Sequence, residues 1–147
     1  MTTPRDSQRA KVYRGENEYK TAFGRQYIDD VLQIQKWVDH IVESAWWVER
    51  FPGVVAVEVK DGRGRRWAYG EHIGGGNGVI ALPCACRCKM TILHELAHTV
   101  VPEDQPWHGG EFVQHYLALV DEWIGELEGA ALRWFLVKNG VKWEDPA

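Results

Sequence analysis

The chain has 147 residues and a formal net charge of −4, so it is long enough to fold as one ordinary domain that buries about 70% of its unfolded surface without disulfide bonds. This charge does not provide the basic field on which DNA binding by the domain alone would rely, so a DNA partner is not supported. No apolar run approaches the roughly 20 residues of a membrane span, and the polar start has no apolar signal core. We therefore expect a cytoplasmic protein that does not associate with a membrane.

Residues 1–17 are polar and charged without a sustained period, which predicts a flexible N-terminal arm before a single domain over residues 18–147. Over residues 27–50, apolar side chains recur at steps of three and four with charged residues between them. This period predicts one long amphipathic helix, which ends near Phe51-Pro52-Gly53.

Short segments rich in β-branched residues and glycine follow the helix. Residues 54–59 and 66–69 flank the turn residues 61–64, which predicts a β-hairpin. The glycine run 74–78 precedes a further predicted strand, residues 79–82, whereas a phosphate-binding loop needs a helix directly after its glycines. We therefore predict a turn at the glycine run and a small, mainly antiparallel sheet.

Three cysteines, Cys84, Cys86 and Cys88, alternate just before the next predicted helix. An odd number of cysteines in one short segment favours free thiols. Structural zinc sites usually combine a C-x2-4-C spacing with a distant second pair, which this chain lacks. Free thiols are therefore the favoured interpretation, with a second metal site as the alternative.

Residues 90–102 contain His94-Glu95-Leu96-Ala97-His98 within an otherwise apolar helical pattern. On a helix of about 3.6 residues per turn, positions i and i+4 lie one above the other, so both imidazoles can reach one metal ion. Glu95 lies about 100° round the helix from His94, which suits a general base acting on a metal-bound water. The spacing is typical of zinc hydrolases. Chance spacing on a solvated face is the alternative, but an apolar helix would bury this polar stripe at a high cost without a ligand.

A catalytic zinc ion normally has three protein ligands and one open position. His108 follows a proline-bounded loop that can turn back over the metal helix, so it is the first candidate for the third ligand. A surface histidine beside Gly109-Gly110 is the alternative reading of His108, and Glu122 on the next helix is the rival ligand. Further helices are predicted over residues 111–127 and 130–138, and the last one closes at Asn139-Gly140.

The segment His94-Glu95-Leu96-Ala97-His98, followed by Trp107-His108-Gly109-Gly110-Glu111-Phe112, resembles the SprT-like group of zincin metallopeptidases. Members of this group carry H-E-x-x-H and then an H-G-x-x-F/W element, and small bacterial and phage metallohydrolases are the most similar members. The resemblance is specific over residues 93–112 and agrees in layout over residues 28–127. It implies an α+β, zincin-like single domain with an N-terminal long helix, a small mainly antiparallel sheet, the active-site helix and following C-terminal helices.

The resemblance also implies site residues. It makes His108, rather than Glu122, the third zinc ligand. It further implies that the strand before the metal helix, residues 79–82, pairs with an extended substrate. The C-x-x-C pairs of the zinc ribbon found in members that act on DNA-bound proteins are absent from this sequence, so cleavage of DNA-protein crosslinks is only weakly implied.

Together, the residues and the resemblance predict a metallopeptidase in which His94, His98 and His108 hold Zn²⁺ and Glu95 is the catalytic base. The expected substrate is a protein or peptide. The residue that stabilises the oxyanion is left open between His115 and Tyr116. One alternative is a non-catalytic, zinc-stabilised interaction module, although such a module needs no general base. The other alternative is a zinc-dependent hydrolase of a non-peptide amide.

Overall fold

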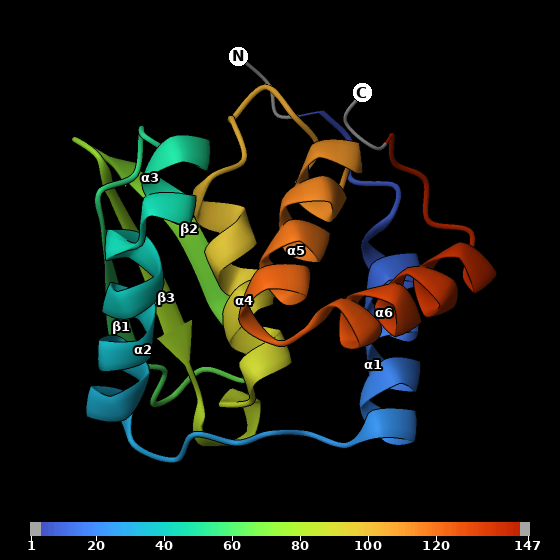
Figure 1. Ribbon diagram of the computed structural model, residues 1–147, viewed down its shortest axis with the longest axis horizontal. Coiled ribbons are helices and arrows are strands. Elements are labelled where there is room, and N and C mark those ends of the chain that lie inside the picture. The colour runs from blue at the N-terminus through green and yellow to red at the C-terminus, as the bar shows by residue number, and fades with distance from the viewer. Residues whose placement is uncertain (1–3, 145–147) are drawn as a thin grey trace. The chain divides into compact units, whose positions relative to one another are not determined.

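The computed structural model describes residues 4–144 of the chain (Figure 1). Within these residues, six α-helices and one three-stranded sheet give the α+β class that was predicted. The chain divides into two compact units, and a single domain over residues 18–147 stays a prediction. One unit runs from Gln26 to Val100, and the other contains the residues up to Arg25 together with those from Val101 onward. None of the described helices combines the length and the apolar character needed to cross a membrane.

The predicted long helix over residues 27–50 is wrong in one respect, because two helices form there. Helix α2 spans Val31–Glu43 and helix α3 spans Ala45–Arg50. Between them, Ser44 has an extended backbone with ψ 151°, and its hydroxyl oxygen accepts a hydrogen bond of 3.2 Å from the Trp47 N–H. Serine is a preferred N-cap residue. Ser44 therefore starts a new helix at a point where the apolar period alone predicts continuation.

The sheet contains β1 (Ala56–Asp61), β2 (Tyr69–Gly74) and β3 (Asn77–Leu82) in the order β1-β3-β2. Strand β3 pairs antiparallel with β2 and parallel with β1. Two predictions are therefore wrong: β1 and β2 do not form a hairpin, and the sheet is not mainly antiparallel. The hairpin lies instead at the glycine turn between β2 and β3, where Gly74, Gly75 and Gly76 have φ values of 91°, 62° and 78°. Glycine adopts these positive values without a steric cost.

Strand β3 is central, so both of its edges are occupied. The outer edge of β1 is covered by Gln35 of α2, whose side chain donates to the Val57 carbonyl at 2.9 Å and accepts from the Val59 N–H at 2.7 Å. The expectation that residues 79–82 offer a docking edge is therefore wrong. Among the described strands, β2 pairs with β3 alone, and its other edge has no strand partner.

Helix α4 spans Lys89–Thr99, packs against β2 and β3, and is buried at every position from Met90 to Thr99 (Figure 1). Two glycines allow this close approach. A Cβ atom on Gly70 would lie 2.3 Å from the backbone oxygen of Glu95, and a Cβ atom on Gly78 would lie 3.0 Å from the Thr99 side chain. The absence of a side chain at Gly70 and at Gly78 therefore allows α4 to lie close to strands β2 and β3.

We expect Gly70→Ala to lower the free energy of unfolding by about 1–3 kcal/mol, because the added methyl group collides with the helix backbone, which cannot turn away as a flexible side chain can. Gly53→Ala is the matched control, since its Cβ atom would meet nothing within 4 Å. Urea unfolding of both variants measures the difference. Equal stability of the two variants would contradict the close approach of β2 to α4.

The second unit is built from α1 (Arg9–Phe23), α5 (Gly110–Trp123) and α6 (Glu126–Lys138), with α6 packed against both α1 and α5. The prediction of a flexible arm is wrong for residues 9–17, because they form most of α1. The buried face of this helix includes Glu16 and Lys20, which form an ion pair of 2.7 Å. Because two charged residues lie on the buried face of α1, the sequence shows no apolar period there.

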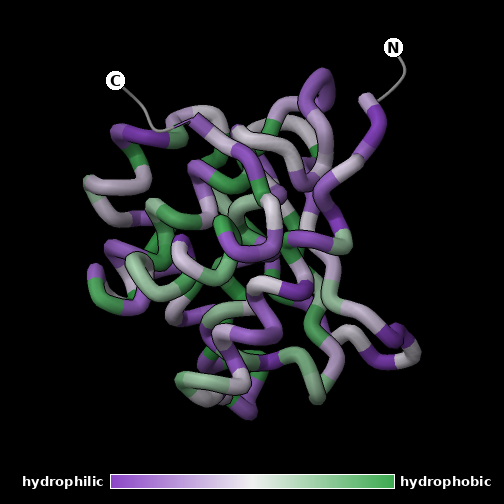
Figure 2. The backbone as a smooth tube through the Cα atoms, turned by 90° about the vertical axis from the view of Figure 1, so that its right-hand side faces the viewer, coloured by the Kyte–Doolittle hydropathy of each residue, from purple (hydrophilic) through white to green (hydrophobic). Residues whose placement is uncertain are grey.

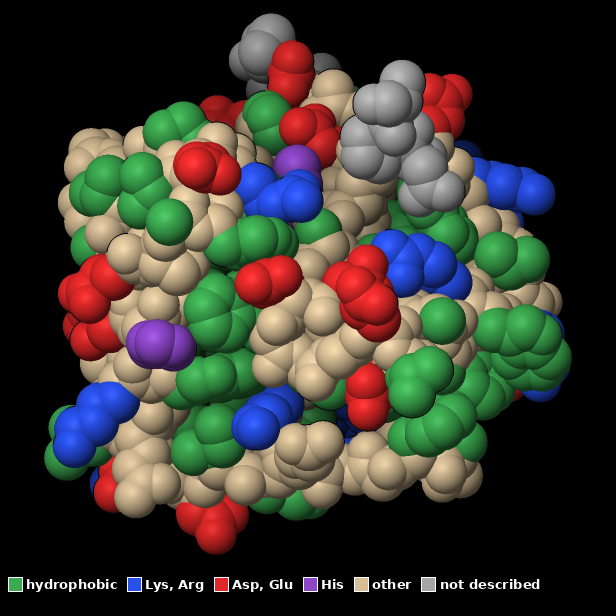
Figure 3. Space-filling view, viewed as in Figure 1, with side chains coloured by type: hydrophobic (Ala, Val, Ile, Leu, Met, Phe, Trp, Pro, Cys, Tyr) green, Lys and Arg blue, Asp and Glu red, His purple; other side chains and the backbone are tan. Residues whose placement is uncertain are grey.

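The predicted closure of the last helix at Asn139-Gly140 is confirmed. Gly140 has φ 79°, its N–H donates to the Val137 carbonyl at 3.0 Å, and the Val141 N–H donates to the Leu136 carbonyl at 3.0 Å. This is the Schellman arrangement. Apolar and hydrophilic residues alternate along the helical turns (Figure 2), but α6 also exposes Leu127, Trp134 and Val137 to solvent. Figure 3 shows hydrophobic side chains on the surface in the region of α6.

Candidate metal centre

The two histidines of the H-E-x-x-H segment lie on consecutive turns of α4 and share one face of it. Their side chains are buried, with residue exposures of 1% for His94 and 2% for His98, and their ring centroids are 5.0 Å apart. A helix that is buried all round fixes the position of both rings. The two side chains therefore lie as their spacing predicts.

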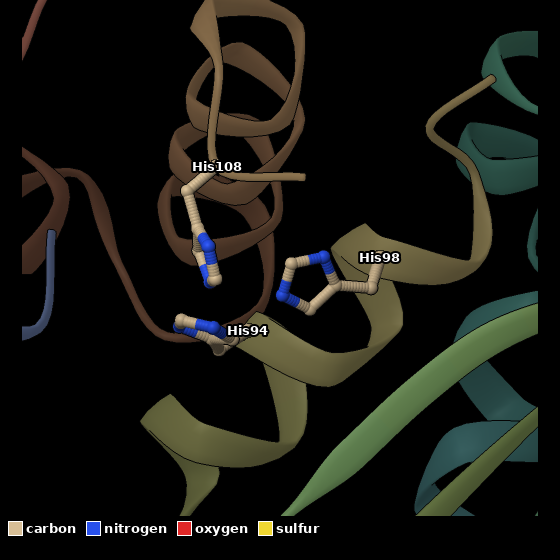
Figure 4. A group of neighbouring side chains, drawn as sticks. All are labelled: His94, His98 and His108. Atoms are coloured by element: carbon tan, nitrogen blue, oxygen red, sulfur yellow. The ribbon is translucent and has the colours of Figure 1, made fainter. Parts of the chain in front are cut away.

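His108 lies just before α5 and is also buried. Its ligand atom and those of His94 and His98 all lie within 4.8 Å of one another. Figure 4 shows the three rings turned toward a common point. This group of three histidines could hold a metal ion.

The His108 ring has contacts on several sides within its own unit. Its Nδ1 atom lies 2.7 Å from Oδ2 of Asp6. The rings of Tyr13 and Phe112 meet it edge-on, with centroid distances of 5.3 Å and 5.0 Å. Asp6 could not be identified from the sequence, because a single aspartate in a polar segment carries no motif or period that could connect it with a residue a hundred positions away.

Glu95 is buried beside His94 on α4, with 3% exposure, and does not belong to the group of ligand atoms. Its role as a general base rather than a metal ligand stays a prediction. The rival ligand Glu122 is exposed on α5 and likewise lies outside the group. The histidine set, rather than a set with a glutamate, is therefore the arrangement that the fold brings together.

The two candidates for an oxyanion donor lie next to each other on α5. His115 is half-buried, and its Nε2 atom lies 3.5 Å from Oε1 of Glu111. Tyr116 is fully buried, and its ring lies 5.6 Å from that of Phe112. Their part in catalysis stays a prediction.

The cysteines form no disulfide: Cys84 is exposed, Cys86 is half-buried and Cys88 is buried. The segment Cys84–Cys86 is a 3-10 helix rather than a strand, so the three side chains do not share one face as alternation would require. The Cys88 thiol lies 3.2 Å from the Thr91 hydroxyl. Within residues 4–144, no cysteine belongs to a group that could hold a metal ion.

We expect a variant with all three cysteines changed to serine to bind the same amount of zinc as the wild type. The group that could hold the metal consists of histidines, and a serine hydroxyl at position 88 can keep the hydrogen bond to Thr91. Elemental analysis after dialysis measures the metal content. A loss of stoichiometric zinc in this variant would show that the thiols take part in binding.

The chemistry of the three side chains fits zinc. Imidazole nitrogen is a common zinc ligand, and a set of three histidines with a fourth, open position is known in catalytic zinc sites. Hard cations such as Mg²⁺ and Ca²⁺ prefer oxygen ligands, which this group does not offer. The donor atoms therefore suit a transition metal ion of the kind that imidazole binds, such as zinc, copper, iron or nickel, better than Mg²⁺ or Ca²⁺.

Comparisons with known proteins do not place the chain in a family: no family model, no curated protein and no solved structure matches it. The resemblance to the SprT-like group therefore rests on the residues quoted for it. The function has to be argued from the site itself.

Proposed function

We propose that this protein is a zinc-dependent metallohydrolase and that it cleaves peptide bonds. The observation that carries the proposal is the convergence of three buried histidines, with ligand atoms within 4.8 Å of one another, beside a buried glutamate on the same helix as two of them. His94, His98 and His108 would hold the metal. Zinc supplies Lewis acidity at such a site, because it lowers the pKa of water and polarises a substrate carbonyl.

Glu95 is the proposed general base. It follows His94 directly on α4, so its side chain projects about 100° round the helix from the histidine stripe. From there the carboxylate takes a proton from the attacking water and delivers it to the leaving amine as the peptide bond breaks. A structural zinc site needs no such group. Glu95 therefore favours an enzyme over the zinc-stabilised interaction module.

Strand β2 is the proposed place of substrate docking, instead of residues 79–82. Its second edge has no strand partner among the described strands, and its Gly70 lies against the backbone of Glu95. An extended peptide that adds to this edge gains main-chain hydrogen bonds along its length. A small non-peptide amide gains none of them. A peptide substrate is therefore favoured over the small amide.

The resemblance of residues 93–112 to the SprT-like metallopeptidases supports the same proposal independently of the geometry. In that group the histidine of the H-G-x-x-F/W element is the third ligand, and His108 occupies this position here. The cytoplasm stays the expected compartment, and the net charge of −4 gives no support to DNA as a partner.

The test combines metal analysis with a broad cleavage screen. The purified protein is loaded with zinc, dialysed and analysed, and it is then incubated with unfolded proteins and a peptide library whose products are read by mass spectrometry. We expect about one zinc ion per chain and cleavage that a chelator stops and added zinc restores. Zinc uptake without any cleavage would favour the interaction module, and cleavage of small amides alone would favour the other alternative.

A further inference from the structure

We propose that Asp6 is a positioning residue of the metal centre, whose carboxylate holds the His108 ring in the tautomer and orientation that present Nε2 to the metal. The inference rests on the proposed role of His108 as a zinc ligand. It assigns a role to a segment in which the sequence shows only a polar arm.

The hydrogen bond between the two side chains sets the tautomer. Oδ2 of Asp6 lies 2.7 Å from Nδ1 of His108. An ionised carboxylate only accepts hydrogen bonds, so Nδ1 must carry the proton and donate it. The lone pair of a neutral imidazole then lies on Nε2, which is the nitrogen left for a metal. The short distance is typical of a charge-assisted hydrogen bond.

Burial strengthens this interaction. The His108 side chain is 2% exposed and that of Asp6 is 21% exposed. Within residues 4–144, the buried Oδ1 atom of Asp6 has no hydrogen-bond partner. The Asp6 carboxylate therefore makes its hydrogen bond to His108 through Oδ2. Away from bulk water, a nearby negative charge makes an imidazole a stronger electron donor to a metal ion.

The segment that carries Asp6 is itself anchored. The side-chain amide of Gln8 donates to the carbonyl oxygens of His108 and Lys142, each at 3.1 Å, and its oxygen accepts from the Lys142 N–H at 2.6 Å. Helix α1 then starts at Arg9. The residues that directly follow Asp6 are thus fixed by the start of α1 and, through Gln8, by the backbone of His108 and Lys142.

His108 needs such a partner more than the other two histidines do. His94 and His98 are fixed by the backbone of a buried helix, whereas His108 precedes the Gly109-Gly110 pair at the end of a loop. A ligand on a loop loses more conformational freedom when it binds a metal. The hydrogen bond to Asp6 fixes the orientation of the His108 ring, as the helical backbone of α4 fixes the positions of His94 and His98. Loss of an outer partner of this kind typically costs about 10–100-fold in metal affinity.

The first measurement is zinc affinity, obtained by competition with a chromophoric chelator for the wild type, Asp6→Ala and Asp6→Asn. We expect about 10–100-fold weaker binding for Asp6→Ala and a smaller loss for Asp6→Asn, which keeps an acceptor oxygen but not the charge. Glu18→Gln is the matched control. Glu18 is a carboxylate on α1 of the same unit, but it pairs with Lys138 at 2.7 Å, so its loss should leave zinc affinity unchanged.

The second measurement reads the tautomer without any metal. Nitrogen-15 NMR of the histidine side chains in the metal-free protein should show His108 protonated at Nδ1 in the wild type and in Glu18→Gln, and a mixture of tautomers in Asp6→Ala. Urea unfolding of the metal-free variants shows whether any effect comes from lost stability. If Asp6→Ala does not fold, Asp6→Asn, which keeps the same shape, carries the comparison.

The outcomes separate the two proposals. A wild type that binds zinc, together with a folded Asp6→Ala that binds it equally tightly and shows the same tautomer, would overturn the role of Asp6 and leave the metallohydrolase proposal standing. A wild type that takes up no zinc would overturn the proposed function, and with it any metal-directed role of Asp6. Weakened zinc binding and a changed tautomer in Asp6→Ala, with an unchanged Glu18→Gln, supports both.

Discussion

Replacement of His108 with alanine is expected to remove most zinc affinity and all hydrolytic activity. His108 is one of three histidines whose ligand atoms lie within 4.8 Å of one another, and the remaining pair on α4 leaves the metal with only two protein ligands. The loss in affinity should exceed the roughly 10–100-fold cost of losing an outer partner of a ligand, because a direct metal bond is lost.

The control for this variant is Glu122→Ala, which removes the rival ligand. Because Glu122 is exposed on α5 and lies outside the histidine group, its removal should leave zinc content and activity unchanged. Both variants are compared by chelator competition and by turnover of a verified substrate. Retention of zinc by His108→Ala together with its loss from Glu122→Ala would replace the assigned third ligand with a carboxylate.

Glu95→Gln is expected to lower turnover by about 10²–10⁴-fold and to leave the zinc content at the wild-type level. Glutamine has nearly the same shape as glutamate and fits the buried position of Glu95 on α4, but it cannot accept the proton of the attacking water. The three imidazoles are not changed. Turnover is measured on zinc-loaded protein, so that metal loss and loss of the base are distinguished.

The outcome that contradicts this assignment is equal turnover by wild type and Glu95→Gln on the same substrate. A large loss of zinc in Glu95→Gln would also contradict it, since the carboxylate would then belong to the ligand set. His94→Ala provides the comparison for that case, because it removes a proposed ligand from the same helix turn.

The site could be predicted where its geometry is local. His94 and His98 lie four positions apart on one helix, so the period of an α-helix alone brings their rings together. The loop before His108 made this residue a candidate, but the choice of His108 over Glu122 rested on the resemblance of its H-G-x-x-F element to a known pattern, since no local rule decides where a loop ends in space. Asp6 could not be predicted, because a contact over a hundred positions depends on how α1 packs, and sequence period carries no information about that packing.

The fold shows the same division. The fold class, helix α4 and the end of α6 follow from the apolar period and from glycine at a helix end, which are local signals. Strand β1 could pair with β2 or with β3, and it pairs with β3. The hairpin forms at the glycine turn after β2 rather than at the weaker turn residues 61–64 before it. The start of α1 was missed because Glu16 and Lys20 satisfy each other inside the unit, which makes a buried face look polar.

The order in which the chain is synthesised has a consequence for when the proposed metal site is assembled. Residues 26–100 form a continuous unit that includes His94, Glu95 and His98, and compact units generally fold as units, the N-terminal ones first, during synthesis. The unit that contains His108 is formed by the residues up to Arg25 together with those from Val101 onward. Within it, the Gln8 side chain forms hydrogen bonds with the backbone of Lys142. A nascent chain therefore contains two proposed metal ligands and the proposed base in one folded unit before the segments that hold His108, the proposed third ligand, have been synthesised.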